Sequence, residues 1–308
     1  MILLESKNIV KQYAEHLALD HVNINIPENS IYGILGPNGA GKTTFIRIIN
    51  CITAPDSGEV FFNGKKLQPS DVASIGYLPE ERGLYKKMKV GEQVLYLARL
   101  KGLSKNDALK KLKYWFEKFE IQPWWNRHVE ELSKGMQQKV QFIATVLHEP
   151  KLLIFDEPFS GFDPLNANLL KQEIIELKKN GATIILSTHN MQSVEELCDH
   201  ISLINKAKVV LNGNMCEIKE RYKQHIFSIK TSDNNVSIPE NDFFQVINME
   251  KNKNLTEIIL KTTTSEMSNN ELLAQLLPYC SILSFEEKLP SMDEIFIKTV
   301  QESFPQRH

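Results

Sequence analysis

A glycine-rich loop between an apolar run and a helix-forming segment constrains this chain more than any other feature. Residues 36–43 read GPNGAGKT and fit the phosphate-loop pattern G-x-x-x-x-G-K-[ST]. The apolar residues 31–35 before the loop predict a buried strand, and residues 44–49 after it predict the first turns of a helix. Glycines allow a tight turn in which successive N–H groups converge, and the helix adds the positive end of its dipole. The segment therefore predicts a site for nucleotide phosphates.

Two side chains carry the chemistry of this loop. Lys42 supplies a positive charge for the β- and γ-phosphates, and Thr43 supplies a hydroxyl for Mg²⁺. The predicted nucleotide-binding residues are Gly36, Pro37, Asn38, Gly39, Ala40, Gly41, Lys42, Thr43 and Thr44.

A second apolar run ends in two carboxylates. Residues 152–157 read LLIFDE, and open α/β sheets bind their ligands at the carboxyl ends of strands. Asp156 is suited to hold Mg²⁺, directly or through water. Glu157 is suited to polarise an attacking water as a general base. Between the two motifs, residues 132–138 read LSKGMQQ, in which Ser133 can cap a helix and Gly135 permits close approach of another backbone.

Composition limits the class of protein. The 308 residues predict one large or two modest domains, and 42% hydrophobic and 24% charged residues are typical of a soluble globular chain. The net charge of −2 argues against nucleic acid as a partner. The four cysteines are widely spaced without a CxxC pair, which argues against a zinc or redox site. No apolar run approaches the roughly 18 residues that span a bilayer, so any membrane-spanning part belongs to another chain.

Periodicity divides the chain into two parts. Strand and helix patterns alternate up to about residue 215, interrupted by a mostly helical stretch over residues 90–130 in which Ser104 is a plausible N-cap. From about residue 220, short strands separated by polar turns and two helical segments predict a small α+β domain. We therefore expect a first domain over residues 1–220 and a second over residues 221–308.

The motifs together resemble the ATP-binding-cassette (ABC) ATPases. Residues 133–137, SKGMQ, resemble the family signature, and Asp156 and Glu157 resemble its Walker B pair. Residues 160–163 resemble the D-loop, with Phe162 in place of the more usual leucine. His189 resembles the switch histidine, and Tyr13 resembles the aromatic residue that stacks on adenine. Order and spacing match from about residue 2 to residue 215.

The resemblance implies a fold, two cofactors and a second copy. The fold is an α/β P-loop NTPase cassette, with a RecA-like core, an antiparallel β subdomain and a helical subdomain. ATP and Mg²⁺ bind in a head-to-tail dimer with a second copy or a homologous ATPase subunit. In that dimer His189 contacts the γ-phosphate in cis and Asp163 belongs to the D-loop. The signature residues act in trans: Ser133, Lys134, Gly135, Met136 and Gln137.

One motif departs from the family pattern. Residues 77–85, YLPEERGLY, stand where the family has its Q-loop, and Glu80 replaces the usual glutamine. A carboxylate also holds Mg²⁺, so Glu80 is a candidate metal ligand, with Glu81 or water as the alternative.

Two short stretches resemble one branch of the ABC family in particular, the exporters. Residues 79–85 resemble sodium-extrusion and some drug-export ATPases, and residues 289–296, LPSMDEIF, resemble subunits with an extra C-terminal domain. We expect an ATP-hydrolysing exporter subunit that drives a separate integral-membrane permease from the cytoplasmic face. The main alternative is a soluble ABC ATPase of the translation or DNA-repair type. The single cassette, without coiled-coil or zinc insertions, argues against it.

Overall fold

The computed structural model describes residues 1–308 except 82, 234–235, 240, 253–254, 265–266 and 304–308. The chain forms two compact units. The first contains Met1–Met215 and the described residues from Thr299 onward, and the second contains Cys216–Lys298. We expected a boundary at residue 220 with everything after it in the second domain. The structure instead divides the chain after residue 215 and assigns the end of helix α9 (Met292–Ser303) to the first unit.

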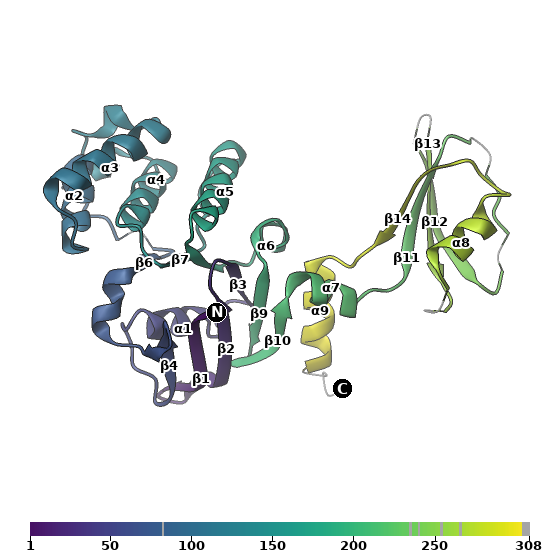
Figure 1. The fold of residues 1–308 in the computed structure, drawn as a ribbon, viewed down its shortest axis with the longest axis horizontal. Coiled ribbons are helices and arrows are strands. Elements are labelled where there is room, and N and C mark those ends of the chain that lie inside the picture. The colour runs from purple at the N-terminus through teal and green to yellow at the C-terminus, as the bar shows by residue number, and fades with distance from the viewer. Residues whose placement is uncertain (82, 234–235, 240, 253–254, 265–266, 304–308) are drawn as a thin grey trace. The chain divides into compact units, whose positions relative to one another are not determined.

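A six-stranded sheet forms the centre of the first unit (Figure 1). Every residue of three of its strands is buried, as expected for parallel strands covered on both faces. The strand order is β10-β9-β3-β8-β7-β6, in which β10 alone is antiparallel to its neighbour. The strands are β3 (Ile31–Leu35), β6 (Ile75–Leu78), β7 (Leu152–Asp156), β8 (Thr183–Ser187), β9 (His200–Asn205) and β10 (Lys208–Asn214).

Strand register aligns the ends of β3, β7 and β8. Ser187, the last residue of β8, pairs with Ile34 of β3 and with Asp156 of β7. The segments that follow these three strands therefore begin at the same edge of the sheet. Four helices are associated with this core: α1 (Lys42–Ile49), α4 (Lys134–Val146), α5 (Pro164–Lys179) and α6 (Met191–Leu197).

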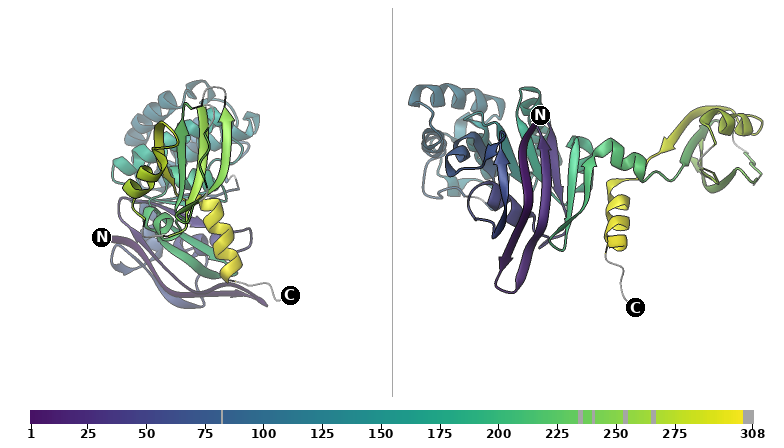
Figure 2. Two further views of the ribbon diagram at one scale, coloured as in Figure 1. Left: turned by 90° about the vertical axis from the view of Figure 1, so that its right-hand side faces the viewer. Right: turned by 60° about the horizontal axis from the view of Figure 1, so that its bottom comes forward.

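An antiparallel sheet forms the second layer of this unit. Its order is β2-β1-β4-β5, and its long β1–β2 ribbon is drawn in purple in Figure 2. The strands are β1 (Ile2–Tyr13), β2 (His16–Pro27), β4 (Ser57–Phe62) and β5 (Lys65–Lys66). Phe45 and Ile46 of α1 belong to one buried cluster with Ile24 of β2 and Ile34 of β3. Helix α1, and with it the phosphate loop, is therefore fixed by apolar packing on both sheets.

The helical stretch has the predicted character. It contains α2 (Val90–Leu100) and α3 (Lys105–Lys118), together with the 3₁₀ turns η2 (Gln122–Trp124) and η3 (Val129–Glu131), whereas a further 3₁₀ turn, η1 (Pro69–Ser74), lies before β6. Ser104 caps α3 by accepting a hydrogen bond from the Asp107 N–H at 3.1 Å. Aromatic rings join this stretch to the core, since Phe142 of α4 lies 6.1 Å from Trp115 and 5.5 Å from Phe155 of β7, measured between ring centroids.

The second unit is a four-stranded antiparallel sheet with a helix on one face (Figure 1). Its strand order is β12-β13-β11-β14. Leu272 and Leu276 of α8 pack with Phe227, Ile258 and Leu260 of the sheet. This confirms the predicted α+β character. The elements are α7 (Met215–Arg221), β11 (Ile226–Thr231), β12 (Phe244–Asn252), β13 (Leu255–Thr262), α8 (Asn269–Leu276) and β14 (Ile282–Lys288). Within the described residues, no helix is long and apolar enough to cross a membrane.

Candidate nucleotide-binding site

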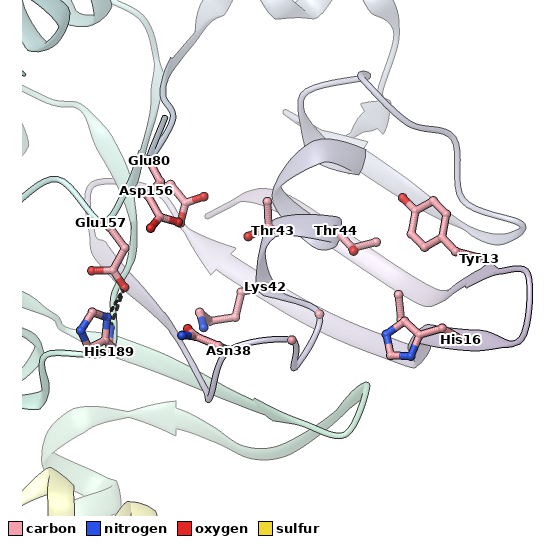
Figure 3. A pocket seen from close by; sticks show the side chains of 13 residues that line it. Tyr13, His16, Asn38, Lys42, Thr43, Thr44, Glu80, Asp156, Glu157 and His189 are labelled. Carbon is pink, nitrogen blue, oxygen red and sulfur yellow. Dashed lines mark hydrogen bonds and ion pairs between the residues drawn. The ribbon is translucent and has the colours of Figure 1, made fainter. Parts of the chain in front are cut away.

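The ends of β3, β7 and β8 meet the β1–β2 turn around one cavity (Figure 3). Its lining comes from segments far apart in the sequence, which the strand register brings together. The residues that line it are Tyr13, His16, Ala18, Asn38, Gly39, Gly41, Lys42, Thr43, Thr44, Glu80, Asp156, Glu157 and His189. Gly36, Pro37 and Ala40 shape the loop instead of lining the cavity. The Ala40 N–H donates to the Pro37 carbonyl at 3.2 Å, and the Ala40 carbonyl accepts from Ala207 at 3.2 Å.

Two glycines of the loop leave no room for a side chain. Gly36 has φ +143° and Gly41 has φ +117°. A Cβ at Gly36 would lie 2.0 Å from the carbonyl oxygen of Ile204, and one at Gly41 would lie 2.3 Å from that of Ala18. Gly39 also has a positive φ of +77°, but a Cβ there would meet nothing within 4 Å.

Alanine substitutions at Gly36 and Gly39 should separate crowding from backbone strain. Because only Gly36→Ala drives a methyl group into a backbone carbonyl, we expect it to lower the free energy of unfolding by about 1–3 kcal/mol more than Gly39→Ala. Urea unfolding of the two variants measures this difference. Equal losses would show that the Ile204 carbonyl moves away without cost.

The side chain of Lys42 folds back onto the phosphate loop. Its side chain is buried, and Nζ donates hydrogen bonds to the carbonyls of Gly36 at 2.7 Å and Pro37 at 3.1 Å. Burial lowers the pKa of Lys42, and the carboxylates of Glu157, Asp156 and Glu80 oppose that shift. The ammonium group is thus held at the cavity by acceptors that a phosphate oxygen can replace.

Asp156 provides a buried carboxylate at the end of β7. Burial raises its pKa, and the nearby charges of Glu80 and Glu157 raise it further, whereas Ser187 and Lys42 lower it. The ionised form is therefore disfavoured in the folded chain, and a cation beside it would favour that form.

The donor set beside Asp156 suits magnesium. Thr43, Glu80 and Asp156 all line the cavity and offer oxygen ligands, which Mg²⁺ prefers. Mg²⁺ takes one or two carboxylates together with phosphate oxygens and water. The described residues contain no group of three or more His, Cys, Asp or Glu side chains placed to hold a metal ion.

Glu157 is held by several donors beside the cavity. Its backbone has φ +48°, and its N–H donates to the Ser187 carbonyl at 2.8 Å. One carboxylate oxygen, Oε1, lies 3.0 Å from the backbone nitrogen of His189 and 2.6 Å from Nδ1 of its ring. The other oxygen, Oε2, accepts from the Thr188 hydroxyl at 3.1 Å. A carboxylate fixed in this way, lining the same cavity as Lys42 and Asn38 (Figure 3), can polarise a water at the end of a nucleoside triphosphate.

Tyr13 and His16 mark the opposite end of the cavity. They pair across the turn that joins β1 to β2, and both line the cavity (Figure 3). Tyr13 is 42% exposed, and Lys11 Nζ lies 5.4 Å from the centroid of its ring, so the aromatic side chain is accessible at the cavity beside a positive charge. Tyr13 was predicted from the sequence, whereas His16 and Ala18 were not. The signal for His16 was its place three residues after Tyr13, directly across a short hairpin turn.

The signature and D-loop residues lie at helix starts. Ser133 caps α4 by accepting from the Met136 N–H at 3.3 Å, and Asp163 caps α5 by accepting from the Asn166 N–H at 3.0 Å. The hydrogen bond from the Asn166 N–H lowers the pKa of Asp163. Asp163 is the residue directly before Pro164, at which α5 begins. The described residues that line the cavity include neither Asp163 nor any of Ser133, Lys134, Gly135, Met136 and Gln137.

The Q-loop segment lies beside the same cavity. Glu80 lines it, whereas the exposed Glu81 is not among its described lining residues. Arg82, part of the motif that resembles exporters, lies outside the described residues.

Comparisons with known proteins relate this chain to one family. The ABC transporter family pattern matches residues 19–160, and the C-terminal domain of DrrA1-3-like ATP-binding proteins matches residues 213–300. The uncharacterized ABC transporter ATP-binding protein YhaQ of Bacillus subtilis (strain 168) is 41% identical over 302 residues, which cover 97% of this chain and 98% of that protein. The lantibiotic transport ATP-binding protein SrtF of Streptococcus pyogenes is 34% identical over 209 residues, 68% of this chain and 90% of that protein.

A solved structure described as the ATP-binding subunit of an ABC transporter is also similar. It matches with a TM-score of 0.67 and 32% identity, covering 71% of this chain and 93% of that one. The sequence is therefore similar to that of YhaQ over nearly its whole length, and the fold of the first unit is similar to that of a solved ATP-binding subunit. The chain belongs to the ATP-binding subunits of ABC transporters, which hydrolyse ATP to power transport.

Proposed function

We propose that this chain is the ATPase subunit of an exporter and works as a head-to-tail dimer, with a second copy or with a homologous subunit. The observation that carries the proposal is that, within one chain, the signature residues do not line the cavity that the phosphate loop forms. The described lining of the ATP cavity contains five residues of the phosphate loop together with Asp156, Glu157 and His189, but not Ser133–Gln137. A signature from a partner subunit would complete the site.

The start of α4 is suited to reach a phosphate on another subunit. Ser133 and Lys134 are exposed, and the first N–H groups of a helix favour an anion. A Cβ at Gly135 would meet the nearest atom of its own chain, the Gly161 carbonyl oxygen, at 3.5 Å, an ordinary contact. Packing within the chain therefore does not require a glycine here. Close approach of a nucleotide bound to the partner would require one.

Seven of the side chains that line the cavity have a role in this proposal. Lys42 binds the β- and γ-phosphates. Thr43, Asp156 and Glu80 supply oxygen ligands for Mg²⁺, which neutralises phosphate charge when bound. Tyr13 stacks on the adenine. Glu157 accepts a proton from the attacking water, and His189 contacts the γ-phosphate in cis.

An apolar groove beside the ATP cavity supports a permease partner. It is formed by residues of η1, α2 and α4 together with Gly76, Tyr77, Pro79, Gly83 and Leu84. Tyr77, Pro79 and Leu84 lie on the groove, whereas Glu80, in the same segment, lines the ATP cavity. A permease helix could bury its apolar face in this groove. Because the segment that lines the groove also carries Glu80, a movement of that helix would shift Glu80 in the ATP cavity. In this proposal the chain acts at the cytoplasmic face of a membrane, bound to the permease.

Export is the direction that the comparisons support best. SrtF is named as a lantibiotic transport protein, and residues 79–85 and 289–296 resemble exporter subunits. A soluble role in translation or DNA repair remains the alternative that an experiment must separate.

Detergent extraction of native membranes separates these two functions. We expect a tagged chain to co-purify with a multi-span membrane protein, and Leu100→Glu to reduce the recovered partner by about ten-fold or more because it places a charge in the groove. Leu100 is 65% exposed and lines the groove. Ile52→Glu, at a 60% exposed position outside the groove, is the matched control. Recovery of the chain without any membrane protein would favour the soluble function.

A further inference from the structure

A buried hydroxyl contacts Glu157 although its residue is not among the described residues that line the ATP cavity. Thr188 follows β8 directly and is 1% exposed. Its Oγ1 donates to Oε2 of Glu157 at 3.1 Å. The same oxygen accepts a hydrogen bond from the backbone N–H of Asn190 at 3.2 Å. Thr188 therefore links the carboxylate to the backbone at the start of α6.

The two contacts determine where the hydroxyl proton lies. A threonine hydroxyl has one proton to donate and lone pairs with which to accept. The Asn190 N–H can only donate, so it occupies a lone pair of Oγ1. An ionised carboxylate can only accept, so the single proton of Thr188 must lie on the line to Oε2 of Glu157. The hydroxyl is thus a fixed donor to the carboxylate.

This donor fixes the plane of the carboxylate. The terminal torsion of a glutamate side chain is broad and offers little intrinsic preference. The backbone and ring nitrogens of His189 both bind Oε1, whereas Thr188 alone among the described partners of the carboxylate binds Oε2. Without Thr188, the Oε2 end would be free to turn about the axis through Oε1. With it, one lone pair of Oε2 is engaged, and the direction of the other is set.

We propose that Thr188 is a positioning residue for the reaction, because it holds Oε2 of Glu157 in the orientation from which that oxygen accepts a proton from water. The inference rests on the proposed role of Glu157 as general base. A hydroxyl that merely satisfies a buried N–H would affect stability and ATP binding together. A positioning hydroxyl affects the rate of hydrolysis at saturating ATP and leaves ATP binding intact.

Three substitutions separate these roles. Thr188→Val keeps the shape and removes the hydroxyl, Thr188→Ala removes it without any risk of a clash, and Thr188→Ser keeps it. Turnover at saturating ATP and the dissociation constant for ATP are measured separately, and thermal unfolding reports folding. We expect the valine and alanine variants to lose about ten-fold or more in turnover with ATP affinity within about three-fold of the native chain. Serine should restore turnover to within about three-fold of the native rate.

Other results would overturn the proposal. These are native turnover in the valine and alanine variants, a serine variant as slow as they are, or loss of folding in both variants that lack the hydroxyl. Glu157→Gln, measured in parallel, tests the underlying function. If it hydrolyses ATP at the native rate, the proposed general base is wrong. If it is inactive while Thr188→Val and Thr188→Ala are native, only the role of Thr188 fails.

Discussion

Glu157→Gln is expected to slow ATP hydrolysis by about 10²–10⁴-fold while leaving ATP binding intact. Glutamine keeps the size of the side chain, and its amide oxygen can still accept from His189 or Thr188. It cannot take up the proton of an attacking water. Because bound ATP holds the two subunits together in the proposed dimer, the ATP-bound dimer should accumulate when hydrolysis is slow. Steady-state turnover and gel filtration with ATP and Mg²⁺ measure the two effects.

A surface carboxylate provides the control for this substitution. Glu59→Gln removes an equivalent charge from β4, where Glu59 is half exposed and pairs only with Lys66 among the described ion-pair partners. Such a pair contributes little, so its turnover should match the native rate. If Glu157→Gln hydrolyses ATP at the native rate, Glu157 is not the general base. A variant that stays monomeric with ATP would count against the dimer.

Lys42→Ala is expected to weaken ATP binding by about 100-fold or more, equivalent to about 2.8 kcal/mol. The cavity contains the carboxylates of Glu80, Asp156 and Glu157. Without the ammonium group, the phosphates would face these negative charges with one cation fewer. Titration calorimetry or a fluorescent ATP analogue gives the affinity.

The matched control is the same lysine-to-alanine substitution at a surface position away from the cavity. Lys66 is 62% exposed in its side chain, and Lys66→Ala should bind ATP as the native chain does. Thermal unfolding should accompany the measurement, because Lys42 also donates to the Gly36 and Pro37 carbonyls. A folded Lys42→Ala chain with native ATP affinity would show that the ammonium group does not reach the phosphates.

The main part of the site was predictable because local patterns carry it. A strand, a glycine-rich turn and a helix are contiguous in residues 31–49, and Asp156 and Glu157 follow an apolar run directly. The sheet then brings these segments together, since parallel strands present their carboxyl ends at one edge.

The finer geometry depends on contacts that span the sequence. The bonds from Thr188 and His189 to Glu157 require β7 and β8 to pair with Asp156 opposite Ser187. No local pattern specifies that register. His16 lines the cavity only because the turn after Tyr13 is short. Helix α7 was missed because its seven residues offer too few turns for a clear period.

The division into two units shows a similar limit. The change of pattern near residue 220 indicated a second domain, and the structure groups Cys216–Lys298. Helix α9 continues past Lys298 without any break in its sequence pattern. The sequence near Thr299 therefore does not indicate that the chain belongs to the first unit again from that residue.

Cross-linking between copies tests the composite ATP site most directly. Asn38 of the phosphate loop and Lys134 of the signature are both exposed. Asn38→Cys and Lys134→Cys chains, each also carrying Glu157→Gln, are mixed with ATP and Mg²⁺ and oxidised. Cys51 and Cys216 are exposed in the native chain, so the parent without added cysteines is the background control.

A head-to-tail dimer predicts a cross-linked species of about twice the 35.3 kDa chain mass in the mixture. Neither cysteine variant alone should form it above background, and neither should the mixture without ATP. A mixture that cross-links no more than the separate variants would contradict a site shared between two copies.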